Sequence, residues 1–352
     1  MGTQETSAVL MQAIRLHQVG QRPTLDEIPV PEPGPGEVRV AVRACGLCGS
    51  DVHILHGTTP TGPLPLVLGH EPSGIVDKLG EGVFGRSVGD RVCIAAGFGC
   101  DNCPACDAGR ATVCPRLEIP GITRDGSQAT YVVVPARTLI SLPEQVDFAT
   151  GAILMDAVST PYHAIKKSGV TRGQTAVVFG LGGLGLHALT ILSQVVGAHV
   201  IGVDRYPGAL ERALRFGADE VVDASGGKPA NAVRLLTGGG VDHAFEFVGA
   251  AAVVDQAVKS LRPGGTCTVV GVTPEPLHLL PQALLVSNEL RLQGSFGCSQ
   301  DELVELVGLV AGGALDLTGT ITHRFGLADF DSALQVLETK EGDPIRVVVE
   351  QP

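Results

Sequence analysis

The sequence predicts an α/β protein in which a parallel, doubly wound sheet is joined to a β-rich domain. From about residue 170 onward, short apolar runs alternate with helical stretches, which is the pattern of a parallel sheet. The first 150 residues instead show short alternating runs separated by proline-dense loops. A chain of 352 residues is long enough for two domains that each bury a core.

The N-terminal part is predicted to form short strands. Between residues 37 and 45, Val38, Val40 and Val42 alternate with charged or small residues, as in a half-buried strand. Prolines are dense at 23–35 and 60–72, so we expect loops there.

The second part is predicted to alternate strands with helices. We expect strands at 175–179, 199–203, 220–222, 243–248, 267–270 and 290–293, and helices at 186–196, 208–217, 229–236 and 251–261. A last strand is expected at 347–349. The predicted layout is one domain made of residues 1–158 and 296–352, with residues 159–295 inserted as a second domain.

Charge and hydropathy exclude several classes of partner. The chain carries 25 basic and 37 acidic residues, a formal charge of −12, which disfavours nucleic acid or an anionic membrane as a partner. No apolar stretch approaches the roughly 18 residues of a membrane span. Residues 1–12 lack the basic start and apolar run of a signal peptide, so we expect a cytoplasmic protein.

Nine cysteines need an explanation in a compartment that keeps thiols reduced. Six of them fall into two clusters, which are Cys45 with Cys48, and Cys100 with Cys103, Cys106 and Cys114. An odd total and tight clustering favour metal binding over a disulfide framework. The remaining three, Cys93, Cys267 and Cys298, are interpreted as small core residues.

A glycine-rich turn follows the strand expected at 175–179. Its residues are Gly180, Leu181, Gly182, Gly183, Leu184 and Gly185. In such a turn the first glycine permits the bend, the second lets the backbone approach a pyrophosphate, and the third allows close helix–strand packing. The N-terminus of the following helix attracts phosphate. The pattern predicts a dinucleotide-binding turn.

Asp204 ends the next expected strand, where a carboxylate can hold both hydroxyls of the adenosine ribose. Because Asp204 would repel a ribose 2′-phosphate, we expect NAD in preference to NADP. Arg205 beside it weakens this preference, since an arginine there can accept the phosphate. A structural turn with a helix-capping aspartate is the alternative interpretation.

Cys100, Cys103, Cys106 and Cys114 supply four thiolates within a short loop. Four sulfurs can enclose a tetrahedral Zn²⁺ and leave no position open for a substrate, so the spacing predicts a structural zinc. An iron–sulfur site and a redox pair formed by one CxxC are the alternatives. The wider spacing favours zinc over an iron–sulfur cluster.

Two further motifs lie earlier in the chain. They are Cys45-Gly46-Leu47-Cys48-Gly49-Ser50-Asp51-Val52-His53 and Gly69-His70-Glu71. Taken alone, the first resembles a zinc knuckle and the lone histidine a structural side chain. Together with the four-cysteine loop, the glycine turn and the aspartate after it, they resemble the zinc-containing medium-chain dehydrogenase/reductase family. This family includes alcohol, sorbitol and threonine dehydrogenases, and the resemblance covers nearly the whole chain.

The resemblance implies a GroES-like catalytic domain, a Rossmann NAD-binding domain and a second, catalytic zinc. Cys48 and His70 would be two of its ligands, and Glu71 an acid close to the metal that can coordinate it at some stage. Asp51 would orient the His70 ring. Liver-type members carry a cysteine as third ligand where this sequence has Asp156. Asp156 is the expected ligand here; a helix cap without catalytic zinc is the alternative.

The resemblance also implies the chemistry. Zinc acidifies the bound alcohol, and the resulting alkoxide passes a hydride to the nicotinamide. Ser50 would take the hydroxyl proton and pass it through a cofactor ribose hydroxyl to His53, which reaches solvent. Gly271 and Val272 would flank the nicotinamide, and Arg346 would contact the pyrophosphate.

The substrate is expected to be a secondary or cyclic alcohol. Ala96 stands where liver-type members carry a bulky aromatic residue, which predicts a roomier pocket. The alternatives are hydride addition to an activated C=C bond and a non-enzymatic cofactor-binding protein. The strand expected at 290–293 is an edge that family members pair across a two-fold axis, so a homodimer or homotetramer is expected.

Overall fold

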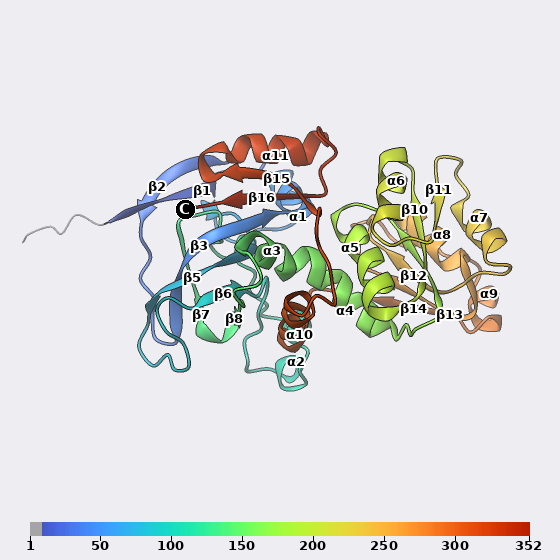
Figure 1. The fold of residues 1–352 in the computed structure, drawn as a ribbon, viewed down its shortest axis with the longest axis horizontal. Coiled ribbons are helices and arrows are strands. Elements are labelled where there is room, and N and C mark those ends of the chain that lie inside the picture. Colours follow the sequence, from blue (N-terminus) through green and yellow to red (C-terminus); the bar gives the residue numbers. More distant parts are fainter. Residues whose placement is uncertain (1–8) are drawn as a thin grey trace, which may run out of the picture. The chain divides into compact units, whose positions relative to one another are not determined.

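A computed structural model describes residues 9–352 of the chain (Figure 1). Residues 1–8, which carry most of the segment compared with a signal peptide, lie outside the described residues. The described chain divides into two compact units. The first contains residues 9–156, 299–307 and 318–352, and the second contains residues 157–298 and 308–317. The sequence predicted an inserted second domain at residues 159–295, and these domain limits stay a prediction.

The first unit contains two sheets. A three-stranded sheet has the order β2-β1-β4, formed by Thr24–Pro29, Leu10–Leu16 and Leu66–Val67. A seven-stranded sheet has the order β15-β16-β3-β5-β6-β8, with β7 paired to β3. Its strands are β15 (Ile321–Gly326), β16 (Arg346–Glu350), β3 (Glu37–Leu47), β5 (Glu71–Leu79), β6 (Arg91–Ile94), β8 (Leu139–Ser141) and β7 (Tyr131–Pro135).

The strand β3 is the central element of this sheet. Its alternating valines Val38, Val40 and Val42 are buried in one apolar cluster, as the sequence pattern predicts. It extends to Leu47 rather than 45, and it pairs antiparallel with β5 on one side and with β16 on the other. Both the loop after β3 and the loop before β5 carry predicted metal ligands.

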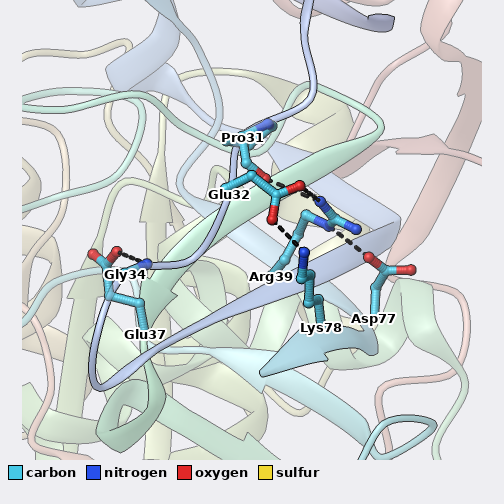
Figure 2. Close-up of polar contacts among 7 residues, drawn as sticks. All are labelled: Pro31, Glu32, Gly34, Glu37, Arg39, Asp77 and Lys78. Atoms are coloured by element: carbon cyan, nitrogen blue, oxygen red, sulfur yellow. Dashed lines mark hydrogen bonds and ion pairs between the residues drawn. The ribbon is translucent and has the colours of Figure 1, made fainter. Parts of the chain in front are cut away.

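An ion-pair network ties the proline-dense loop to β3 and β5 (Figure 2). The Arg39 guanidinium donates to Asp77 at 2.5 Å, to the Pro31 carbonyl at 3.2 Å and to Glu32 at 3.0 Å. Lys78 also donates to Glu32, at 2.5 Å. The network fixes the loop against these two inner strands of the sheet.

Short helices complete the first unit. They are α1 (Gly49–Leu55), α2 (Pro104–Asp107), α3 (Phe148–Ile153) and α11 (Phe330–Thr339), together with residues 300–307 of α10 (Gln300–Ala311). A core cluster joins α1, α11 and β16 through residues such as Ile54, Leu334 and Val347. A π-helix, Leu154–Val158, follows α3 directly and contains Asp156.

The second unit contains a six-stranded parallel sheet of order β11-β10-β9-β12-β13-β14. Its strands are β9 (Thr175–Phe179), β10 (His199–Asp204), β11 (Glu220–Asp223), β12 (Val241–Glu246), β13 (Leu261–Val269) and β14 (Arg291–Gly294). Its helices are α4 (Ser159–Ser168), α5 (Gly183–Ile191), α6 (Pro207–Arg215), α7 (Pro229–Leu236), α8 (Ala251–Lys259) and α9 (Gln282–Ser287). This order reverses between β9 and β12, as in a dinucleotide-binding doubly wound sheet.

Some boundaries predicted for the helices and strands of this unit were wrong. The strand expected at 243–248 spans Val241–Glu246, because the chain leaves the sheet after Glu246. The helix expected at 186–196 begins at Gly183 and continues beyond Ile191 as a π-helix, Leu192–Val196. No helix within residues 9–352 is long and apolar enough to cross a membrane.

Candidate metal centres and dinucleotide site

The four cysteines of the predicted structural site converge. The Sγ atoms of Cys100, Cys103, Cys106 and Cys114 all lie within 4.8 Å of one another. The Cys114 sulfur is 3.5 Å from that of Cys100 and 3.7 Å from that of Cys103. All nine cysteines of the chain are free thiols in the structure. Four sulfurs at these distances fit a closed tetrahedral zinc site.

Hydrogen-bond donors surround these sulfurs. The backbone N–H groups of Cys100 and Arg116 donate to the Cys114 sulfur at 3.4 and 3.3 Å, and the Arg116 guanidinium donates to the Cys100 sulfur at 3.0 Å. The bond from Arg116 lowers the pKa of Cys100 to about 6. A metal ligand must be a thiolate, and these donors stabilise the thiolate form.

A second cluster lies in the first unit. One candidate ligand atom from each of Cys48, His70, Glu71 and Asp156 falls within 4.8 Å of the others. Cys48 caps α1 immediately after β3, His70 ends the loop before β5, and Glu71 is the first residue of β5. Pairing of Gly46 with Glu71 brings these two loops together. Asp156 completes the cluster from the π-helix, a form of helix that occurs often at functional sites.

Two glycines make this arrangement possible. A Cβ atom at Gly46 would lie 2.0 Å from the Glu71 carboxylate, so a larger residue there would displace Glu71. Gly69, immediately before His70, has a φ of +98°, and a Cβ there would lie 2.7 Å from the Gln128 backbone nitrogen. Both positions require glycine if His70 and Glu71 are to hold their places.

The His70 ring is buried between two carboxylates. Its Nε2 lies 3.5 Å from Asp156 and its Nδ1 lies 3.6 Å from Asp51, and neither nitrogen makes a hydrogen bond within residues 9–352. Burial alone would lower the pKa of His70, but the charges of Asp51 and Cys48 raise it well above its usual value. Buried ring nitrogens that make no hydrogen bond in the described chain, next to a thiol and a carboxylate, fit a divalent metal with three protein ligands.

Glu71 binds a residue that is far from it in the sequence. Its buried carboxylate accepts a hydrogen bond from the Arg346 guanidinium, and its second oxygen has no hydrogen-bond partner among the described residues. Burial raises the pKa of Glu71 to about 7, against the effect of Arg346. The sequence suggested a pyrophosphate contact for Arg346; the structure gives it this buried partner, and the pyrophosphate contact stays a prediction.

Three predicted residues lie on α1. The Asp51 carboxylate accepts the Cys48 N–H at 2.9 Å, and the Ser50 N–H donates to the Cys48 sulfur at 3.2 Å. Ser50 is half-buried, whereas His53 is exposed at the end of the same helix. Cys45 is not part of the cluster; it lies within β3, where burial raises the pKa of its thiol.

The glycine turn has the geometry of a dinucleotide site. Gly180 has a φ of +88°, and a Cβ at Gly185 would lie 1.7 Å from the Gly180 carbonyl oxygen. At Gly182, the N-cap of α5, a Cβ would meet nothing within 4 Å. The open space over a helix N-terminus fits a pyrophosphate, while the helix packs tightly beneath it. Gly183 and Leu184 follow in the first turn of α5 and are half-buried.

Asp204 lies at this same edge, at the end of β10. Its carboxylate accepts the Leu181 N–H at 2.8 Å and the N–H groups of Arg205 and Tyr206 at 2.7 and 3.1 Å. The Arg205 guanidinium stacks on the Tyr206 ring at 4.9 Å. Asp204 therefore also holds the glycine turn in place.

The turn after β13 carries Gly271 and Val272, and the Val272 side chain is 71% exposed. Sequence reasoning missed Glu246, a fully buried acid at the end of the neighbouring β12. The signal that marks it is an acidic residue within the otherwise apolar run 244–248.

Two metal clusters on one unit and a glycine turn on a parallel sheet of the other define a zinc- and dinucleotide-binding dehydrogenase. Residues 34–144 match the model of the alcohol dehydrogenase GroES-like domain, and residues 183–312 match that of the zinc-binding dehydrogenases. The chain therefore belongs to the zinc-containing medium-chain dehydrogenase/reductase family, and it is an NAD-dependent oxidoreductase of the alcohol dehydrogenase type.

Relatives of known name support this assignment. An alcohol dehydrogenase of Geobacillus stearothermophilus is 33% identical over 305 residues, covering 86% of this chain and 90% of that protein. A probable D-xylulose reductase A of Aspergillus fumigatus is 33% identical over 345 residues, covering 95% and 94%. An alcohol dehydrogenase from E. coli CFT073, solved with NADH, superposes with a TM-score of 0.91 at 27% identity, covering 97% and 99%.

Proposed function

We propose that this enzyme interconverts secondary or cyclic alcohols and their ketones at a zinc ion held by Cys48, His70 and Asp156. The observation that carries the proposal is the second cluster, in which a thiol, an imidazole and a carboxylate converge in a buried site. Three protein ligands leave one zinc position for a substrate oxygen, and the ion supplies a Lewis acid there.

The chain's own residues set the properties of this site. Cys48 and Asp156 contribute two negative charges, and Asp51 orients the His70 ring from its other side. An aspartate oxygen is a harder donor than the cysteine of liver-type members, so the metal keeps more of its Lewis acidity. Arg346 binds one carboxylate oxygen of Glu71. The other oxygen makes no hydrogen bond within the described chain and can still coordinate the metal.

Proton transfer is assigned to α1. Ser50 would accept the proton of the substrate hydroxyl as it gives its own proton to a ribose hydroxyl of the bound cofactor, and His53 would release a proton to solvent from the exposed end of the helix. Ser50 is supported by its place beside Cys48, to whose sulfur its backbone N–H donates.

The choice of a secondary alcohol rests on two observations. Ala96 is small and half-buried where liver-type members carry an aromatic residue. Relatives named D-xylulose reductase act, by that name, on a ketose, whose carbonyl corresponds to a secondary alcohol. Hydride addition to a C=C bond is not favoured, because that reaction does not need the metal cluster that this chain retains.

Metal content and substrate range test the proposal together. We expect elemental mass spectrometry to find about two zinc ions per chain in wild type and one in Asp156→Ala. NAD⁺ reduction should favour secondary and cyclic over primary alcohols, and Asp156→Ala should lose it. Asp147→Ala, which removes a helix-capping aspartate outside the cluster, should keep both zinc ions.

One zinc ion in wild type purified with excess metal contradicts the catalytic site. Two zinc ions with a preference for primary alcohols contradicts only the substrate class. Ser50→Ala with normal zinc content and normal turnover contradicts the proton transfer.

We also propose that two chains associate through β14. This strand ends the six-stranded sheet, so its outer edge is unpaired within the second unit. Exposed apolar side chains lie near it in sequence, among them Leu284, Val286 and Phe296. Sedimentation should show a dimer or tetramer, and Leu292→Pro in β14 should give monomers; a monomeric wild type contradicts the proposal.

A further inference from the structure

Glu246 is a fully buried acid at the carboxyl end of β12. The strand lies between β9 and β13, and Glu246 pairs with Phe179 on one side and with Val269 on the other. Its position therefore adjoins both turns expected to hold the cofactor, the one that begins at Gly180 and the one at residues 271–272. Burying a carboxylate costs free energy unless it is well bonded.

The side chain is bonded to the loop that follows it. One carboxylate oxygen accepts the N–H groups of Val248 and Gly249, both at 2.8 Å. The Glu246 carbonyl also accepts the Gly271 N–H at 3.1 Å. The second carboxylate oxygen makes no hydrogen bond within the described chain and would lie 2.9 Å from a Cβ atom at Gly271. Glu246 thus contacts the loop 247–250 and the turn 271–272 at once.

The loop 247–250 in turn touches both cofactor turns. A Cβ at Gly180 would lie 2.6 Å from the Val248 side chain. A Cβ at Gly271 would lie 2.1 Å from the Gly249 nitrogen, and one at Gly249 would lie 2.7 Å from the Val272 carbonyl. There is no room between these segments, so a displacement of the loop is passed to the turns on either side.

We propose that Glu246 is a positioning residue for dinucleotide binding, which fixes the loop 247–250 and through it the Gly180 and 271–272 turns. It acts without touching the cofactor. Removing its carboxylate leaves the Val248 and Gly249 N–H groups without acceptors, and the loop must move to satisfy them. The affinity for NAD(H) then falls even where the fold survives.

The chain provides a matched control in the same strand. Asp242 is also a buried acid of β12, but it lies at the opposite end. It accepts the Thr175 N–H at 2.9 Å and pairs with Arg262. Asp242→Asn therefore perturbs β12 without reaching the cofactor turns, and it reports what a purely structural change does.

The test measures NADH binding and thermal unfolding of the zinc-loaded enzyme. NADH emission reports its binding, and the chain contains no tryptophan that could transfer energy to the cofactor. We expect Glu246→Ala to raise the Kd for NADH about tenfold or more, since two hydrogen bonds to a charged acceptor are lost. Glu246→Gln keeps an oxygen for both N–H groups, so its Kd should rise by only about threefold. Asp242→Asn should leave the Kd unchanged.

The proposal is overturned if Glu246→Ala and Glu246→Gln bind NADH as tightly as wild type and change only the unfolding temperature, which is the behaviour expected of Asp242→Asn. If Glu246→Ala does not fold, the Kd for NADH of Glu246→Gln is compared with that of Asp242→Asn, and equal values overturn the proposal. A wild type that does not bind NADH overturns the dinucleotide site itself along with the role of Glu246. Unchanged zinc content in all variants separates this result from any failure of the catalytic metal site.

Discussion

Arg346 donates a buried hydrogen bond to Glu71, although the two residues are 275 positions apart. Neither side chain is more than 3% exposed. The contact joins β16, the last strand described, to Glu71 at the start of β5, immediately after His70. The last strand of the first unit is therefore part of the support of the metal cluster.

Arg346→Met should strongly destabilise the protein, because it leaves the Glu71 carboxylate buried without its cation. We expect the free energy of unfolding in urea to fall by about 3–5 kcal/mol. The double variant Arg346→Met with Glu71→Gln should recover part of this loss. Arg324→Met, which breaks the exposed pair with Glu350, should cost no more than about 1 kcal/mol. Equal losses for the two arginines contradict the prediction.

Arg116→Ala should weaken the hold of the four-cysteine loop on its zinc. The variant loses the donor to the Cys100 sulfur and a bond to the Asn102 carbonyl. We expect the zinc affinity of this site to fall by about tenfold, measured as release of one zinc ion per chain to a competing chelator. Arg110→Ala changes an exposed arginine of the same loop and should release zinc as wild type does. Identical release curves for both variants argue against the role of Arg116.

Gly185→Ala and Gly182→Ala should separate the folding role of the glycine turn from its binding role. A methyl group at Gly185 meets the Gly180 carbonyl at 1.7 Å, so we expect about 3 kcal/mol of destabilisation. A methyl group at Gly182 enters open space, and the backbone there has a φ of −75° that alanine accepts. Gly182→Ala should fold normally and bind NADH more weakly, because the methyl group occupies the approach to the helix N-terminus. Normal NADH binding by Gly182→Ala speaks against a pyrophosphate at this position.

Much of the second unit is predictable from sequence because its inner strands β9, β10 and β12 are buried on both faces. The strand expected at 175–179 has the limits of β9, and the helix expected at 229–236 has those of α7. The predicted end of this strand, at residue 248, was wrong because Phe247 and Val248 continue the apolar pattern beyond Glu246. The chain leaves the sheet there since the Glu246 carboxylate accepts N–H groups that strand pairing would otherwise use. Periodicity carries no trace of such a side-chain bond.

The metal clusters differ in how far sequence can predict them. Four cysteines on one loop are local, so their spacing alone indicates a site. The π-helix that carries Asp156 has no signature in the sequence pattern, and only the family resemblance marks that residue. The bond between Glu71 and Arg346 joins opposite ends of the chain and cannot be inferred from either neighbourhood.

His243 should make the stability of the protein depend on pH on the acid side of neutrality. It is buried in β12, where burial lowers its pKa; Asp242 opposes this shift, and Arg262 and Arg291 add to it. A histidine whose pKa is lower in the folded state binds its proton more readily when unfolded. The neutral His243 therefore supports the folded state fully at pH values above 6.5, the pKa of the unfolded chain. This contribution to the free energy of unfolding is lost as the pH falls below 6.5.

We expect the free energy of unfolding of wild type to fall between pH 6.5 and pH 5 with a steeper slope than that of His243→Leu. The difference in slope can reach about 1.4 kcal/mol per pH unit, the limit for one proton. His278→Leu, which changes an exposed histidine of the same unit, should keep the wild-type slope. Acid release of zinc affects all three proteins alike, so the comparison isolates His243. Parallel slopes for wild type and His243→Leu contradict the prediction, because they mean that His243 takes up its proton equally in the folded and unfolded chains.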